Sequence, residues 1–237
     1  MLYHVVTHCY AKSLPHYAAL LRYHLSGFLL HPPKSGEVSV DVHTTKDDIA
    51  TVRVLEDFMG LHSDADMFRG VFMDDACVGR RAIGRNFSAL KSAADWVIFT
   101  DVDHVWQGEA LDRIGKVVQL PTNAMHFPPE ILIAKDHDVG DQIWRKEGLL
   151  LDVDPSLFIP KFYNRAIGGV QIVTGDFARR HGYLNNTHWT SPTSRKPFAD
   201  FRDDIAYRKF CEIAGDTVKI DKIKGIYRIR HSATSYR

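Results

Sequence analysis

The sequence predicts an α/β fold with a mainly parallel central sheet and helices on both faces. Short apolar runs rich in β-branched residues alternate with segments of helical periodicity through the first half of the chain. Such alternation is typical of parallel sheets, because each parallel strand needs a crossover connection, usually a helix, before the next. The 237 residues are enough for one sizeable core, so we expect a single domain over residues 1–237.

The individual elements follow from periodicity and from helix-breaking residues. The expected strands cover residues 3–7, 38–43, 71–73, 97–100, 168–173, 218–220 and 226–229. The expected helices cover residues 13–30, 49–59, 83–94 and 203–214. Pro32 and Pro33 end the first helix, Asp47 or Asp48 caps the second, and Gly215 ends the last. The proline-rich residues 121–165 and the polar residues 185–197 are expected to form long loops.

Composition excludes several classes of partner. Lys and Arg number 30 and Asp and Glu 29, so a net charge of +1 gives no electrostatic reason to expect nucleic acid. No run approaches the roughly 20 apolar residues of a transmembrane helix, and Met1–Tyr10 lacks the basic start of a secretion signal. Three cysteines far apart do not suggest a disulfide framework. We therefore expect a cytoplasmic protein without a transmembrane segment.

Two carboxylates stand where an α/β sheet opens to ligands. Asp101 and Asp103 directly follow the apolar residues 96–100, and ligands bind at the carboxyl ends of such strands. Mg²⁺ and Mn²⁺ prefer oxygen ligands and commonly join carboxylates to substrate phosphates. A bare Asp-x-Asp is weak evidence, since residues 64–66 and 152–154 have the same pattern and most such pairs belong to turns. Which of the three Asp-x-Asp pairs is the metal site therefore has to be judged from the surrounding sequence.

The surrounding sequence carries a resemblance. Arg81, Arg85 and Asn86 lie on the predicted helix that leads into the strand ending at Asp101 and Asp103. The stretch 84–103 resembles the GT-A-type nucleotide-sugar glycosyltransferases, especially the family 2 group, in residue types and spacing. This resemblance implies a Rossmann-like GT-A domain, with residues 1–120 as the nucleotide-sugar-binding half and residues 121–237 as the acceptor-binding half.

Three later segments extend the resemblance to about residues 81–235. Residues 166–170 resemble the glycine-containing segment of the family, residues 201–204 its Glu-Asp motif, and residues 231–235 its C-terminal His-x-x-x-Ser. The resemblance implies a donor site, a metal site and a catalytic pair. The donor residues are Arg81, Arg85, Asn86, Asp101, Asp103, Gly168 and Gly169. The metal ligands are Asp101, Asp103 and His231, and the catalytic residues are Asp204 and Asp203.

The residue chemistry is consistent with these roles and leaves alternatives open. Asp204 is expected to stay ionised at the start of a helix, as a general base or as a simple helix cap. Asp203 replaces the family's Glu, so the base lies at either position. Arg81 and Arg85 either contact phosphate or are surface arginines. The two glycines allow close backbone approach or form a bulge.

We therefore expect a metal-dependent, inverting sugar transfer that uses Mn²⁺ or Mg²⁺. The donor is a UDP- or GDP-sugar, and the acceptor is a glycan or another hydroxyl compound. Residues 42–45 lack the acid with which the family often reads the nucleobase, so the identity of the donor nucleobase stays open. A nucleotidyltransferase is an alternative, although residues 8–12 lack the glycine-rich loop of that class. A second alternative is a non-catalytic protein that binds a nucleotide sugar. This alternative predicts that the acidic residues do not converge in space.

Overall fold

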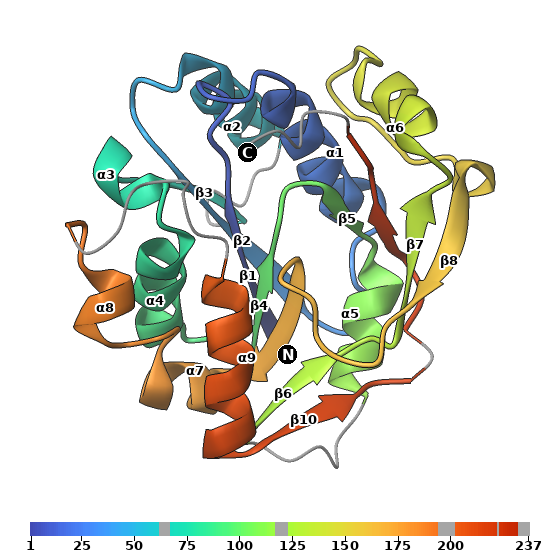
Figure 1. Ribbon diagram of the computed structural model, residues 1–237. Coiled ribbons are helices and arrows are strands. Elements are labelled where there is room, and N and C mark those ends of the chain that lie inside the picture. The colour runs from blue at the N-terminus through green and yellow to red at the C-terminus, as the bar shows by residue number, and fades with distance from the viewer. Residues whose placement is uncertain (62–66, 117–122, 194–201, 222, 232–237) are drawn as a thin grey trace.

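A computed structural model describes residues 1–61, 67–116, 123–193, 202–221 and 223–231 (Figure 1). The Asp-x-Asp pair at 64–66 and residues 232–235 of the C-terminal motif lie outside this part of the chain. The described residues form two sheets flanked by helices. None of the described helices combines the length and the apolar character needed to cross a bilayer. All three cysteines are free thiols, as expected.

The larger sheet has seven strands in the order β10-β6-β9-β4-β1-β2-β3. Its strands are β1 (Leu2–His8), β2 (Glu37–Thr44), β3 (Phe68–Phe72), β4 (Trp96–Thr100), β6 (Ala124–Phe127), β9 (Val170–Thr174) and β10 (Asp216–Lys219). Every neighbouring pair is parallel except the two pairs that β9 makes with β4 and β6. The predicted fold class, a mainly parallel sheet in an α/β protein, is therefore confirmed.

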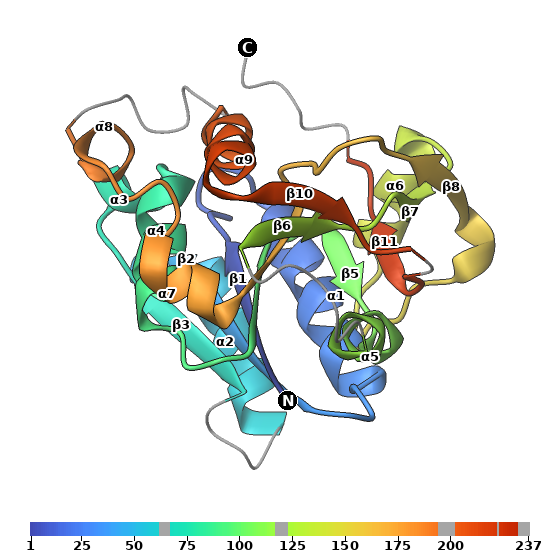
Figure 2. The ribbon, with the colours of Figure 1, turned by 90° about the horizontal axis from the view of Figure 1, so that it is seen from below.

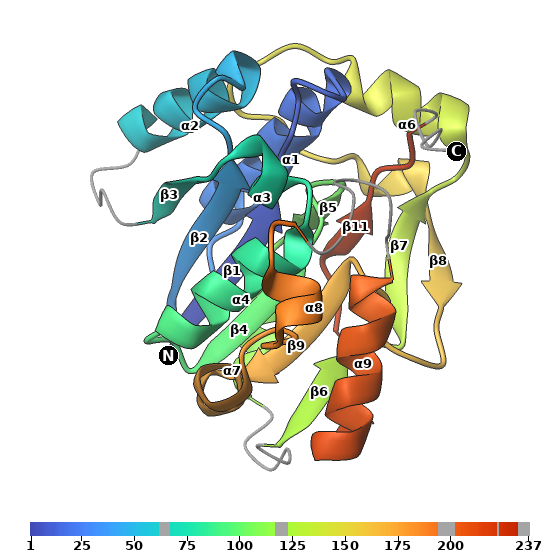
Figure 3. The same cartoon turned by 60° about the vertical axis from the view of Figure 1, so that its left-hand side comes forward.

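Helices cover both faces of this sheet (Figures 2 and 3). One face packs against α1 (His16–Leu30), α2 (Ile49–Leu61) and α5 (Gly108–Gly115), and the other against α4 (Arg81–Lys91), α7 (Gly175–His181) and α9 (Asp203–Ala214). Successive side chains of β4 alternate between the two cores, with Ile98 on the α1 side and Val97 and Phe99 on the α4 side. A strand buried on both faces reads as a continuous apolar run, which explains residues 96–100.

The smaller sheet corrects one expectation. Residues 121–165 are not one long loop: they contribute β6, β7 (Glu130–Ala134), α6 (His137–Trp144), the short 3₁₀ helix η1 (Pro155–Leu157) and β8 (Phe158–Phe162). The second sheet has the order β5-β11-β7-β8, with β5 (His104–Trp106) and β11 (Ile226–Arg228). Prolines explain the difference, because Pro128 and Pro129 separate β6 from β7 and Pro160 lies on the edge strand β8, where proline is tolerated.

Several boundaries match the expectation and a few shift. Helix α9 begins at Asp203 and is followed by Gly215, as expected. The cap of α2 is Asp48, whose Oδ1 accepts a hydrogen bond from the Thr51 amide, whereas Asp47 pairs with Lys12. Strand β3 begins three residues earlier than expected. Two short helices, α3 (Asp75–Val78) and α8 (Thr187–Thr190), complete the described elements.

Candidate active site

A pocket of about 490 Å³ lies at the carboxyl ends of β1 and β4. Its wall combines the end of β4, the first turn of α4, the turn before β9, the first turn of α9 and the segment after β11. Seven of the predicted site residues line it: Arg81, Asp101, Asp103, Gly168, Gly169, Asp204 and His231. Acidic and basic side chains from both halves of the sequence therefore converge on one cavity.

Helix α4 lies unusually close to the ends of β1 and β2, and Gly84 allows this. A Cβ at position 84 would stand 2.7 Å from His43 Nδ1 and would also overlap His8. Only a residue without a side chain permits this approach. The close packing brings one face of α4, with Arg81 and Arg85, to the end of β4.

Asp101 is held by two guanidinium groups. Arg81 Nη1 donates to Asp101 Oδ1 at 2.8 Å, and Arg85 Nη2 donates to the same oxygen at 3.0 Å. Burial alone would raise the pKa of Asp101, but the two arginines outweigh it and the net pKa is lowered. Arg81 also donates from Nη2 to Asp203 Oδ1 at 3.1 Å, so it links the end of β4 to the start of α9.

Arg85 and Asn86 do not line the pocket. Arg85 is fully buried behind Asp101, and its Nη1 donates to the Tyr183 hydroxyl at 2.9 Å. The Oδ1 atom of Asn86 accepts a hydrogen bond from the Tyr183 amide at 3.0 Å, which ties α4 to the segment after α7. Neither side chain is placed for the direct donor contact expected from the sequence. Arg85 supports Asp101 in the pocket wall, and Asn86 holds the backbone of Tyr183, whose hydroxyl is a partner of Arg85.

Asp103 carries the densest set of charge contacts in the pocket. Its Oδ1 accepts from His104 Nδ1 at 2.7 Å, and its Oδ2 accepts from Arg228 Nε at 2.9 Å. His231 Nε2 lies 4.0 Å from the same Oδ2. Burial would raise the pKa of Asp103, but Arg228 and His104 outweigh it and hold the pKa well below its usual range. Asp103 is therefore a carboxylate at any physiological pH.

The predicted metal ligands fit a divalent ion only together with substrate phosphates. Among the residues that the structure describes, no three His, Cys, Asp or Glu side chains stand close enough to hold a metal by themselves. Asp103 and His231 nevertheless face each other, and Asp101 lines the same pocket. Carboxylate oxygens suit Mn²⁺ and Mg²⁺, which commonly complete their coordination with substrate phosphates, whereas imidazole is typical of softer transition metals. These three side chains could form at most a partial ligand set, and a metal ion among them would need further ligands.

The two candidate bases differ in accessibility. Asp203 is buried, accepts the bond from Arg81 and does not line the pocket. Asp204 lines the pocket, and its backbone oxygen accepts from Gln171 Nε2 at 3.0 Å. Burial, together with the nearby charge of Asp203, raises the pKa of Asp204 despite the opposing effect of Arg81. The raised pKa is opposite in direction to the lowering expected for a carboxylate at the start of a helix. The geometry favours Asp204 as the group able to take a proton.

The glycine pair allows close packing against the side chains of Asp204 and His104. A Cβ at Gly168 would stand 2.8 Å from the carboxyl carbon of Asp204, and a Cβ at Gly169 would stand 2.9 Å from His104 Nδ1. Real Cβ atoms essentially never approach so closely. Both glycines therefore permit close packing against side chains of the site, while a close approach of their backbone to a sugar stays a prediction.

A methyl group at position 168 should displace the Asp204 carboxyl. We expect Gly168→Ala to lower sugar transfer on the order of a hundredfold, the effect of misplacing a reacting group by about 1 Å. Gly60→Ala is the matched control, because a Cβ there meets nothing within 4 Å. Steady-state turnover of both variants with a working donor and acceptor measures the effect. Equal turnover in the two variants would contradict it.

Sequence reasoning missed several side chains of the pocket. Tyr10 and Tyr17 line it from the loop after β1 and from α1, and Arg228 enters from β11. His104, which follows Asp103 directly, and Tyr163, which follows β8, also line it. No local motif marks these positions. Arg228 had one available signal, its place three residues before His231 on the same terminal segment.

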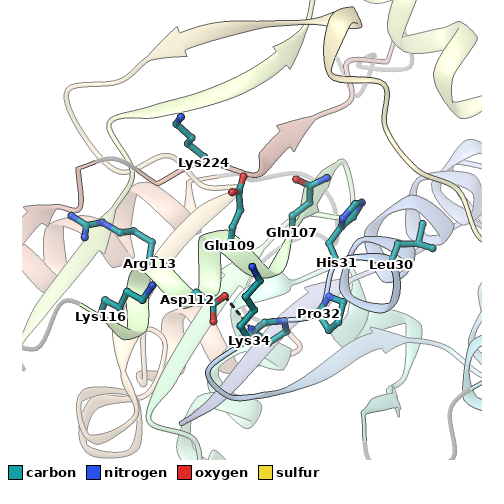
Figure 4. A pocket seen from close by; sticks show the side chains of 11 residues that line it. Leu30, His31, Pro32, Lys34, Gln107, Glu109, Asp112, Arg113, Lys116 and Lys224 are labelled. Carbon is teal, nitrogen blue, oxygen red and sulfur yellow. Dashed lines mark hydrogen bonds between the residues drawn. The ribbon is translucent and has the colours of Figure 1, made fainter.

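A second cavity of about 850 Å³ lies at the opposite end of the large sheet (Figure 4). It lies between the end of α1, the loop before β2, and α5, hence near the amino ends of the strands. Lys34, Arg113, Lys116 and Lys224 surround Glu109 and Asp112 there. None of the predicted site residues lines this cavity, and ligands of α/β sheets bind at the other end of the strands. The smaller pocket is the candidate active site.

No protein-family model matches the sequence, and no curated protein matches it. Among solved structures, S. aureus TarS residues 1–349 in complex with UDP has a TM-score of 0.53 at 13% identity, covering 96% of this chain and 60% of that one. S. aureus TarS itself gives 0.54 at 13% identity, covering 96% and 36%. An active-site mutant of LgtC gives 0.46 at 14% identity, covering 92% and 72%.

At these identities the likeness shows the fold. The chain has the GT-A-like α/β architecture that the sequence resemblance implied. It spans about 60% of TarS 1–349 and about a third of TarS.

Proposed function

We propose that the protein transfers a sugar from a nucleotide-diphosphate sugar to an acceptor hydroxyl with the help of Mn²⁺ or Mg²⁺. The observation that carries the proposal is the convergence of Asp103, His231 and Asp204 on one pocket at the carboxyl end of the sheet. These residues come from three distant segments. A protein that only binds a nucleotide has no need of a carboxyl with a raised pKa, such as that of Asp204, in the same cavity.

The charge of the pocket supports the need for a metal. Asp101, Asp103 and Asp204 line the pocket together with Arg81 and Arg228, so its wall carries a net charge of −1 when the histidines are counted as neutral. A nucleotide diphosphate would bring further negative charge into a largely desolvated place. A divalent ion held by Asp103 and His231 would neutralise the departing diphosphate.

The chain's own residues supply the remaining roles. Arg81 fixes the relative position of Asp101 and Asp203, and so of β4 and α9. Asp204 accepts the proton of the acceptor hydroxyl as that oxygen forms a bond to the anomeric carbon and the bond to the diphosphate breaks. We propose the inverting course, in which Asp204 acts on the face opposite the leaving group. UDP is the first donor nucleotide to test, because the TarS fragment of the same fold binds UDP.

Thermal unfolding with nucleotides and Mn²⁺ tests the donor assignment. We expect UDP together with Mn²⁺ to raise the melting temperature, and either alone to raise it far less. A ligand that binds only the folded state adds about 2.7 kcal/mol at a hundredfold excess over its Kd. GDP and UDP-sugars extend the same series. Equal stabilisation by UDP in Mn²⁺ and in EDTA would contradict metal dependence, and no response to any nucleotide would contradict the donor class.

A further inference from the structure

The ring of His231 lies between Asp103 and the start of α1. Its Nε2 faces Asp103 Oδ2 at 4.0 Å, and its Nδ1 lies 3.1 Å from Nε2 of His16, the first residue of α1. The two imidazole rings stand 4.7 Å apart between centroids. Tyr17 and Trp144 pack around them, with ring centroids 5.6 Å from His231 and 5.5 Å from His16. The proposed ligand therefore has a histidine as its outer hydrogen-bond partner.

The contact between the two rings is a hydrogen bond between ring nitrogens, so one nitrogen carries the proton and the other accepts it. Two neutral imidazoles share one hydrogen bond in either of two directions. His16 Nε2–H donates to His231 Nδ1, or His231 Nδ1–H donates to His16 Nε2. The choice fixes which His231 nitrogen is free for other partners.

The charge of Asp103 and a bound metal ion favour opposite directions of the hydrogen bond between His16 and His231. Without a metal, the carboxylate of Asp103 favours a proton on the facing His231 Nε2, so His16 is the donor. A metal ligand needs a free electron pair on Nε2, so the proton must be on Nδ1 and His16 becomes the acceptor. His16 can take both parts, because an imidazole has one donor and one acceptor nitrogen.

We propose that His16 is a positioning residue for His231, resting on the proposed metal-dependent function. It holds the ring with Nε2 toward Asp103 in both states and accepts the Nδ1 proton when a divalent ion binds. The protons balance: one leaves His231 Nε2 for solvent, one crosses from His16 Nε2 to His231 Nδ1, and one is taken up at His16 Nδ1. His16 lines a separate cavity of about 770 Å³ beside Trp144, which gives this uptake a route to water.

Two substitutions at position 16 separate hydrogen bonding from packing. Phenylalanine keeps a ring against Tyr17 and Trp144 but has no hydrogen-bonding atom. Glutamine loses the ring but carries both an acceptor oxygen and a donor nitrogen. A packing role predicts that His16→Phe behaves like the wild type and that His16→Gln is impaired. The positioning role predicts the reverse order. Thermal melting first establishes that each variant is folded.

Calorimetric titration of Mn²⁺ into protein with UDP gives the first measurement. We expect His16→Phe to weaken Mn²⁺ binding by about 10- to 100-fold, as losing an outer hydrogen-bond partner of a metal ligand does, and His16→Gln to stay close to the wild type. Equal Mn²⁺ affinity in wild type and His16→Phe, or impairment in His16→Gln alone, would overturn the role of His16. Absence of Mn²⁺ binding in the wild type would overturn the metal proposal itself and His16's role with it.

Nitrogen-15 NMR of the histidine rings gives a second measurement that does not depend on turnover. In the metal-free wild type we expect His231 to carry its proton on Nε2, and with Mg²⁺ and UDP on Nδ1. The wild type and His16→Gln should both complete this change, while His16→Phe should not at the same Mg²⁺ concentration. An identical change in His16→Phe would overturn the assignment even if the wild type binds metal as proposed.

Discussion

Replacing Asp103 by alanine should abolish the metal dependence of nucleotide binding. The carboxylate is fixed by His104 and Arg228 in an orientation that faces His231, so the variant loses the central oxygen ligand of the proposed site. We expect Mn²⁺-linked affinity for UDP to fall by more than about 100-fold, because a direct ligand contributes more than its outer partners. The net charge of the pocket also becomes less negative, so nucleotide binding in EDTA should not fall. Calorimetric titration of UDP in Mn²⁺ and in EDTA measures the affinity with and without the metal.

Two companion variants make this result specific. Asp152→Ala removes an acid of the other Asp-x-Asp pair that the structure describes. Asp152 lies away from the pocket, where its Oδ2 is 2.9 Å from His31 Nε2, so this variant should bind Mn²⁺ and UDP normally. Asp103→Asn keeps the side-chain shape and a carbonyl oxygen for the His104 N–H, so it reports the loss of charge with less structural disturbance. Loss of metal-linked binding in Asp152→Ala alone would show that the wrong acid pair had been chosen.

The part of the site that could be predicted from the sequence is local in the chain. Asp101 and Asp103 follow a strand that is apolar up to Thr100 because both of its faces are buried, and ligands of α/β sheets bind at such strand ends. The position of α9 follows from its helical sequence pattern, and its end follows from the glycine after it. Each of these signals needs only neighbouring residues, so each was available without the structure.

The part that could not be predicted depends on tertiary contacts. Arg228 reaches Asp103 because β11 pairs with β5, a contact between residues more than 100 positions apart. The full burial of Arg85 follows from the packing of α4 on the segment after α7. Arg85 is therefore not the surface arginine that the sequence also allowed, and it supports Asp101 from behind. Periodicity and motif spacing contain no information about either contact. The second sheet was missed because proline on an edge strand resembles proline in a loop.

Replacing Asp204 by asparagine should separate donor binding from chemistry. Asp204 lines the pocket but has no contact with Asp103 or His231 among the described interactions, so UDP and Mn²⁺ affinity should stay nearly unchanged. Transfer should fall by roughly 10²- to 10⁴-fold, the usual effect of losing a general base. In the wild type, kcat/KM should decrease as the pH falls through the raised pKa of Asp204, because only the ionised carboxyl accepts a proton. This acid limb should be absent from the asparagine variant.

Asp203→Asn is the matched control for this prediction, and its expected effect is different in kind. Asp203 is buried and accepts a hydrogen bond from Arg81, so its replacement weakens the link between β4 and α9 and should lower stability as well as turnover. Steady-state release of nucleoside diphosphate, donor titrations and melting curves for both variants distinguish the two roles. Near-normal turnover in Asp204→Asn with collapse in Asp203→Asn, at unchanged stability, would move the base by one residue. Near-normal turnover in both would contradict the inverting course and point to a retaining enzyme or to a base outside α9.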